Sequence, residues 1–143
     1  SPWRPIIHIE DICRAMIAAL TAEPDAVAGE AFNVGNDGGN YRIRDIAETV
    51  GSVFDGSTVT TGSDGSDTRS YRVSFAKIAA HMPGFRCEWD AERGARQLRE
   101  LFRRIGLTEA MFQSPPFTRL KELRHLRETG QIDAALFWTP LAA

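Results

Sequence analysis

Histidine and cysteine side chains, the most versatile catalytic and metal-binding groups, are few in this chain. The histidines are His8, His81 and His125, and the cysteines are Cys13 and Cys87. No Cys-x-x-Cys pair occurs and the histidines lie far apart, whereas structural zinc sites use closely spaced pairs of ligands. Two cysteines are also too few for a disulfide framework. The sequence therefore predicts no metal site and two free thiols.

The motifs that accompany nicotinamide and nucleophilic chemistry are also missing. Gly35, Gly38 and Gly39 follow a predicted strand, but their spacing is not that of a dinucleotide-binding loop and is typical of a turn. Neither Tyr41 nor Tyr71 is followed by a lysine four residues later, and no Gly-x-Ser-x-Gly is present. The chain itself therefore predicts no catalytic and no cofactor-binding residue.

The composition is that of a globular domain of ordinary size. Of the 143 residues, 43% are hydrophobic and 25% are charged. The net charge of −2 gives no electrostatic reason to expect a nucleic-acid partner. No stretch reaches the ~20 apolar residues of a membrane-spanning helix, and none has the order of a signal peptide. We therefore expect a cytoplasmic protein that binds neither nucleic acid nor membrane.

The apolar periodicity predicts strands and helices in alternation, followed mainly by helices. Strands are expected at 5–9 and 31–34, and each is followed by an amphipathic helix, at 12–20 and 43–54. Further short strands are predicted at 59–61 and 71–73, and further helices at 74–81, 91–105 and 120–129. This order indicates an α/β fold with a region 1–106 and a helical C-terminal extension 107–143.

The predicted strands are too few to form a sheet of their own. A strand–helix–strand unit implies a parallel pair, and parallel strands normally have neighbours on both sides and helices on both faces. The chain also opens within patterned sequence. We therefore expect it to be part of a longer protein whose first half supplies a sheet, and we expect residues 31–34 to join that sheet.

Four segments, in order, resemble segments of the extended short-chain dehydrogenases. Arg4–Ile12 reads RPIIHIEDI and resembles the family's Arg-x-Phe-Ile-His-Val-x-Asp, and Gly29–Gly35 reads GEAFNVG and resembles Gly-x-x-Phe-Asn-Val-Gly. Asp67–Ile78 is similar to the Asp-x-x-x-Tyr-x-x-Ser-x-x-Lys segment. Pro83–Trp89, with the helix after it, is similar to the Leu-Gly-Phe-x-Pro ending. Together they cover roughly residues 3 to 105.

This resemblance points to the NAD(P)-dependent nucleotide-sugar epimerases and dehydratases. It implies that the chain is the C-terminal, substrate-binding part of such an enzyme, and that the N-terminal Rossmann half is absent from it. That half would bind NAD or NADP and carry the catalytic groups. The full-length protein would be an epimerase, dehydratase or reductase that acts as a homodimer on a nucleotide-sugar-like small molecule, whereas this chain alone would have no turnover.

The resemblance also implies substrate-binding residues, namely Arg4, Asp67, Arg69 and Tyr71. Arg4 matches the arginine that approaches the substrate diphosphate, and guanidinium groups bind phosphate oxygens in pairs. Many family members have a second arginine at the position of Asp64, so Arg69 would have to take its role. Surface roles for both arginines, and strand packing for Tyr71, remain alternatives.

Two other functions remain open from the sequence. The chain is either a non-catalytic binding module on the same scaffold, or part of an extended short-chain dehydrogenase with a substrate other than a nucleotide sugar; the aspartate at position 64 leaves room for the latter. His8, flanked by isoleucines with no patterned carboxylate or nucleophile, is expected to be structural.

Overall fold

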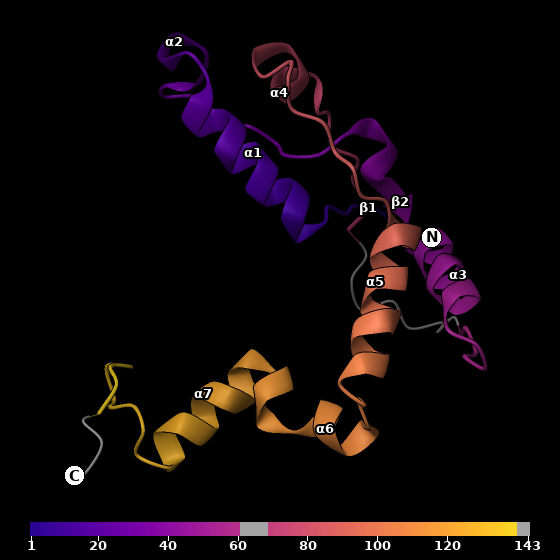
Figure 1. The fold of residues 1–143 in the computed structure, drawn as a ribbon, viewed down its shortest axis with the longest axis vertical. Helices are drawn as coiled ribbons and strands as arrows, with labels where there is room; N and C mark the ends of the chain where they lie inside the picture. Colours follow the sequence, from indigo (N-terminus) through magenta and orange to yellow (C-terminus); the bar gives the residue numbers. More distant parts are fainter. Residues whose placement is uncertain (61–68, 140–143) are drawn as a thin grey trace. The chain divides into compact units, whose positions relative to one another are not determined.

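The protein forms two units, shown as a ribbon in Figure 1. Unit 1 spans Ser1–Glu100 and unit 2 spans Leu101–Ala143. A computed structural model describes residues 1–60 and 69–139. The division lies inside helix α5 (Ala91–Arg104), and the boundary that the sequence predicts, after residue 106, lies just beyond the end of that helix.

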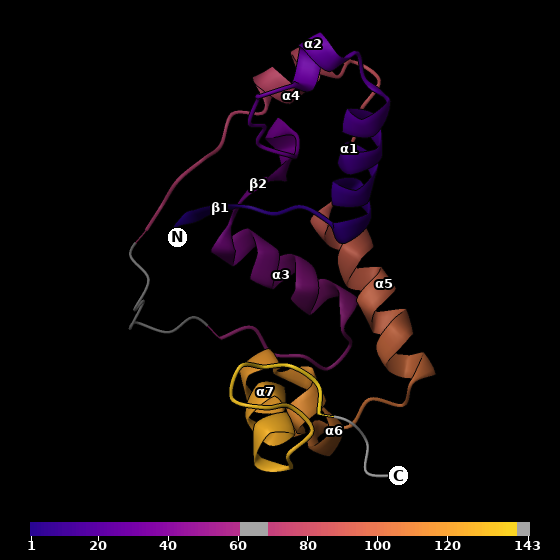
Figure 2. The same ribbon diagram turned by 90° about the vertical axis from the view of Figure 1, so that its left-hand side faces the viewer.

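Unit 1 is mostly helical and contains two short strands. Its elements are β1 (Trp3–Pro5), α1 (Ile9–Thr21), α2 (Pro24–Val27), the 3-10 turn η1 (Asp37–Gly39), β2 (Asn40–Arg42), α3 (Ile43–Val53), α4 (Ala76–His81) and the first part of α5. Figure 2 shows α4 and α3 toward opposite ends of this unit, with the strands between them. The predicted α/β class therefore holds only loosely, because the described residues contain mainly helix.

The two strands pair in an antiparallel manner, and β2 was not predicted as a strand; the parallel pair expected between residues 5–9 and 31–34 is not formed within the described residues. Trp3 lies opposite Arg42 and Arg4 lies opposite Tyr41. The first strand ends at Pro5 instead of continuing to residue 9, because the side chain of His8 caps α1: its Nδ1 accepts a hydrogen bond from the Glu10 amide at 3.2 Å.

The strand predicted at 31–34 is not formed within the described part of the chain. A strand needs a backbone partner, and no backbone amide of residues 31–34 donates to another backbone there. Residues 59–60 are also irregular, and residue 61 lies outside the described residues. Residues 71–73 make only one backbone bond to β1, from the Tyr71 amide to the Trp3 carbonyl at 3.3 Å.

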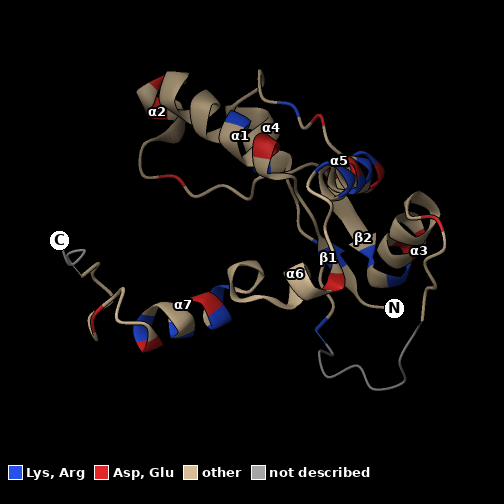
Figure 3. Cartoon of the chain, turned by 60° about the horizontal axis from the view of Figure 1, so that its bottom comes forward, with Lys and Arg blue, Asp and Glu red and all other residues tan. Residues whose placement is uncertain are grey.

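Unit 2 is a short helical segment. It contains the end of α5, then α6 (Glu109–Gln113), the 3-10 turn η2 (Pro115–Phe117) and α7 (Arg119–Glu128). Basic and acidic positions are mixed along α7 in Figure 3, as expected for a solvated helix face. Gly106 and Gly130 have φ values of +59° and +71° just after α5 and α7, where glycine ends a helix without steric cost.

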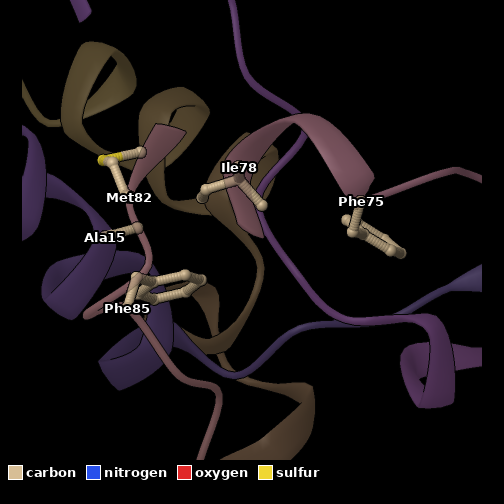
Figure 4. Close-up of a cluster of buried hydrophobic side chains, with 5 residues drawn as sticks. All are labelled: Ala15, Phe75, Ile78, Met82 and Phe85. Atoms are coloured by element: carbon tan, nitrogen blue, oxygen red, sulfur yellow. The ribbon is translucent and has the colours of Figure 1, made fainter. Parts of the chain in front are cut away.

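The core of unit 1 lies between α1 and α4. Its buried side chains are Ala15 on α1, Ile78 on α4, and Phe75, Met82 and Phe85 beside α4, as Figure 4 shows. Each fully buried large side chain contributes roughly 1.5–3 kcal/mol. Phe32 and Val34 are partly buried against the same cluster, so the segment 31–34 lies beside the core although it forms no strand.

Helix α1 has a second apolar face that the described residues leave exposed. Ile9, Cys13, Met16, Ile17 and Leu20 follow one another at helical spacing, and Leu20 is 86% exposed. A helix that is apolar on opposite sides is typical of one covered on both. No helix in the described ranges has both the length and the apolar composition needed to cross a membrane.

Candidate functional site

The guanidinium of Arg4 lies where three segments of unit 1 meet. Its carbon is 5.1 Å from the centre of the Tyr71 ring. Its NH1 donates to the Trp3 carbonyl at 2.8 Å and also to the Arg69 carbonyl. These contacts hold a permanently charged, forked donor in a fixed orientation, which is the chemistry that binds phosphate or carboxylate oxygens.

Asn40 holds the segment that carries Arg69 and Tyr71 against the sheet. It is 8% exposed on β2. Its Oδ1 accepts from the Val73 amide at 2.8 Å, and its Nδ2 donates to the Val73 carbonyl at 3.0 Å. The side-chain amide of Asn40 thus pairs with the backbone of Val73 as a peptide group of a neighbouring strand would. Nothing in the spacing of the sequence singles out Asn40 for this role.

Three of the four predicted substrate-binding residues come together in the structure. Arg4 and Tyr71 are in contact through the cation–ring pair, and Arg69 contributes its carbonyl to Arg4. Tyr71 is 47% exposed, so much of its surface is open to solvent. Asp67, with Asp64 of the same loop, lies outside the described residues.

A buried carboxylate near the start of α1 is the main positioning residue that the sequence does not reveal. Asp11 is fully buried. Its two oxygens accept hydrogen bonds from the Glu88 and Trp89 amides, each at 3.0 Å, and from Arg14 at 3.0 Å. The carboxylate therefore joins α1 to the segment that leads into α5. The sequence indicates only an acid near a helix N-terminus.

His8 is partly buried and is held by Gln97, the Glu10 amide and Trp89, and its structural role stays a prediction. Its Nε2 lies 2.8 Å from Oε1 of Gln97, and its ring stacks on Trp89 with centres 3.9 Å apart and planes 12° apart. Because Nδ1 accepts from the Glu10 amide, the ring donates from Nε2. Trp89 also donates its indole N–H to Glu10 at 3.1 Å.

The described residues of unit 1 line, among others, two cavities of the size that small molecules occupy. One of about 360 Å³ is mainly apolar and lies between residues 6–9, α3 and α5. The other, of about 390 Å³, is lined by Gly35, Phe75, Arg86 and Cys87 among others. Burial raises the pKa of the Cys87 thiol, and the nearby charge of Asp11 raises it further, so the thiol is kept in its less reactive, protonated form.

The chain was compared with protein-family profiles, with curated proteins and with solved structures, and none of the three comparisons gives a match. The resemblance to extended short-chain dehydrogenases therefore rests on the four segments. Among the described residues, no cluster of three or more histidine, cysteine, aspartate or glutamate side chains has a geometry suited to a metal ion.

An ion pair between Glu30 and Lys77 joins the residue just before the segment 31–34 to helix α4. The hydrogen bond and charge of Lys77 hold the pKa of the Glu30 carboxyl below its ordinary value. Because the Glu30 pKa is lower in the folded than in the unfolded chain, the ion pair stabilises the folded state at pH values above the unfolded-state pKa. This stabilisation is lost as the pH falls through the folded-state pKa. We predict that Lys77→Gln returns the pKa of Glu30 toward its ordinary value.

The measurement is a pH titration of the Glu30 side-chain carboxyl by NMR. Lys121→Gln is the matched control, because Lys121 is the other lysine of the chain and donates only to the Gln113 carbonyl, at 3.3 Å, in unit 2. An unchanged Glu30 titration in Lys77→Gln would show that the pair does not form in solution.

Proposed function

We propose that this chain is the substrate-binding portion of an NAD(P)-dependent enzyme that resembles the nucleotide-sugar epimerases and dehydratases. The observation that carries the proposal is the convergence of Arg4, Arg69 and Tyr71, which the resemblance assigns to the substrate, from segments 65 residues or more apart. In this role the guanidinium of Arg4 would bind oxygens of the substrate diphosphate.

A second half of the protein would complete this site. Two features of unit 1 support it: the exposed apolar stripe of α1, and residues 31–34, which lie beside the core without a strand partner in the described ranges. An unpaired extended segment next to an uncovered apolar helix face suits the edge of a larger sheet. A Rossmann half would provide that sheet and hold NAD or NADP.

The proposal predicts that the 143-residue chain binds a diphosphate through Arg4. Inorganic pyrophosphate titrated into the chain at constant ionic strength should shift the Arg4 and Tyr71 NMR signals in a saturable manner. Arg4→Gln should weaken this binding by about 1.5–3 kcal/mol, the range for a hydrogen bond to a charged group. NAD should not bind, because the chain contains no dinucleotide-binding loop.

Arg96→Gln is the matched control for charge, because Arg96 is exposed and pairs with Glu92 on the same helix. Equal weakening by both variants would mean that pyrophosphate senses only net charge, and would refute the proposed role of Arg4. A uridine diphosphate sugar forms a further arm. If the uridine diphosphate sugar binds no more tightly than pyrophosphate, the second candidate is favoured. In that case the substrate is not a nucleotide sugar, as the aspartate at position 64 allows.

A further inference from the structure

An apolar cavity of unit 1 has no role in the proposed diphosphate site. It is the cavity of about 360 Å³ between residues 6–9, α3 and α5, and we call it the α3–α5 cavity. Figures 1 and 2 both show α3 next to α5. None of Arg4, Arg69 and Tyr71 lines this cavity. Its volume is within the range of small-molecule sites, about 300–1,000 Å³.

Hydrogen bonds hold the walls of the α3–α5 cavity in place. The hydroxyl oxygen of Tyr41, on β2, accepts from the Ala91 amide at the start of α5 at 3.2 Å. His8 Nε2 lies 2.8 Å from Oε1 of Gln97, which joins the segment before α1 to the same helix. Three segments far apart in the sequence are thus fixed around one space. Such a cavity is formed before a ligand arrives, as small-molecule sites usually are.

The wall that α5 contributes is smooth, because most of its side chains are small. Four residues of this helix line the cavity, and their spacing places them on one face. They are Ala91, Gly94, Ala95 and Leu98. Ile6 and, on α3, Ile46 and Val50 line it as well. A wall of small residues lets a flat ring approach along its whole face, which increases the number of favourable dispersion contacts.

The lining favours an uncharged ligand. Most of its side chains are aliphatic, and a charge moved from water into apolar surroundings is costly unless it is paired. Among the described residues the lining contains neither lysine nor arginine, so an anion would have no partner there. Asp90 also lines the cavity, but its Oδ1 accepts from the Arg93 amide at 2.7 Å, as the cap of α5.

The Tyr41 hydroxyl has a hydrogen-bond donor to offer to a ligand. Its oxygen accepts from the Ala91 amide, and no acceptor for its proton is found among the described residues. The ring N–H groups of His8 and Trp89, which also line the cavity, each have an acceptor within unit 1. A polar group within a mainly apolar lining usually fixes the orientation of a ligand. The ligand that suits this cavity therefore carries an acceptor.

We propose that the α3–α5 cavity binds a small uncharged ring compound, aromatic or alicyclic, that carries a hydrogen-bond acceptor such as a carbonyl oxygen. The ring lies against Ala91, Gly94 and Ala95, and its acceptor receives a hydrogen bond from the Tyr41 hydroxyl. Burial of the ring provides most of the affinity, and the hydrogen bond sets the orientation.

The test is an NMR titration of the 143-residue chain with three naphthalene compounds of similar shape. 2-Acetylnaphthalene has a carbonyl acceptor, 2-ethylnaphthalene has none, and 1-(2-naphthyl)ethylamine is positively charged at neutral pH. Binding is followed by the methyl signals of Ile46, Val50 and Leu98. We expect saturable shifts, with 2-acetylnaphthalene binding about two- to tenfold more tightly than 2-ethylnaphthalene, as for one net hydrogen bond. The amine should bind most weakly.

Two variants and one matched control assign the shifts to the cavity. Tyr41→Phe should remove the preference for 2-acetylnaphthalene and leave the affinity for 2-ethylnaphthalene unchanged, which also shows that this variant is folded. Gly94→Ala adds a methyl group 3.7 Å from Cδ2 of His8 and should weaken both compounds by about tenfold. Alanine favours the helix, so α5 is retained. Gly84→Ala adds the same group where nothing lies within 4 Å, and should bind both compounds normally.

Shifts that rise linearly without saturation, or equal weakening by Gly84→Ala, would overturn the proposal. A preference for 2-acetylnaphthalene that survives in Tyr41→Phe would refute the role of Tyr41, and tighter binding of the amine would refute an uncharged ligand. Pyrophosphate is followed at Arg4 and Tyr71, whereas these compounds are followed at α3 and α5. Failure of this proposal is therefore distinguishable from failure of the proposed function.

Discussion

Replacing Asp11 with alanine is expected to lower the free energy of unfolding of unit 1 by about 2–5 kcal/mol, because hydrogen bonds to a charged acceptor contribute about 1.5–3 kcal/mol each and two are lost from buried backbone. The variant leaves the Glu88 and Trp89 amides without their acceptor, whereas Arg14 loses one of its two carboxylate partners and keeps Glu88 at 2.8 Å. An unsatisfied buried donor costs its full desolvation, so several losses add at one position. The measurement is urea unfolding followed by amide signals of unit 1.

Asp45→Ala is the matched control for this prediction. Asp45 occupies the third position of α3, as Asp11 does of α1, but it is only partly buried. Its loss should cost only the helix-dipole contribution of about 0.3–1 kcal/mol. If both variants lose the same stability, Asp11 acts merely as an acid at a helix start. Faster hydrogen exchange at the Glu88 and Trp89 amides in Asp11→Ala would identify the broken contacts directly.

Gly35→Ala is expected to be the second most damaging single change, with a loss of about 2–4 kcal/mol from overpacking and backbone strain together. Gly35 has a φ of +154°, a conformation that residues with a side chain rarely adopt. A Cβ at this position would lie 2.5 Å from Cε1 of Phe75, which is 6% exposed in the core of unit 1. Phe75 therefore has to move, and the core with it.

Gly84→Ala provides the comparison, because a Cβ at Gly84 would meet nothing within 4 Å and its backbone needs no glycine conformation. Its stability should match that of the unmodified chain or rise by a few tenths of a kcal/mol, since alanine restricts the unfolded state. Thermal unfolding of the two variants, followed by the amide signals of unit 1, tests the difference. Equal melting of both would mean that the Phe75 ring moves aside at little cost.

Helices α1, α3, α4, α5 and α7 were predictable because their signals are local, whereas the short helices α2 and α6 were not predicted. The apolar spacing of Ile12, Ala15 and Ala19 on α1 is set by the period of the helix, and Gly106 and Gly130 mark helix ends through a conformation that glycine adopts readily. The same local reasoning fails for residues 31–34. An apolar β-prone run specifies a strand only when a partner strand is present, and the described residues supply none.

The residues of the candidate site also fall into two groups, those that the sequence predicts and those that it does not. Arg4 and Tyr71 were predicted as site residues because a guanidinium suits a phosphate and because short motifs carry the resemblance. Asn40 and Asp11 were not found, because their roles depend on backbone groups 33 and 77 residues away. A polar side chain that serves a distant backbone leaves no periodicity in the sequence around it, and its importance becomes visible only in three dimensions.

The separation between Asp11 and its backbone partners also has a consequence during synthesis. A ribosome adds residues at about 5–20 per second, so the 77 residues between Asp11 and Glu88 take roughly 4–15 s to appear. Throughout that interval the Asp11 carboxylate lacks the two backbone amides that it accepts from in the folded chain. The start of α1 can therefore be fixed to the segment that leads into α5 only after residue 89 has been added, and any pause in synthesis before that point delays this step.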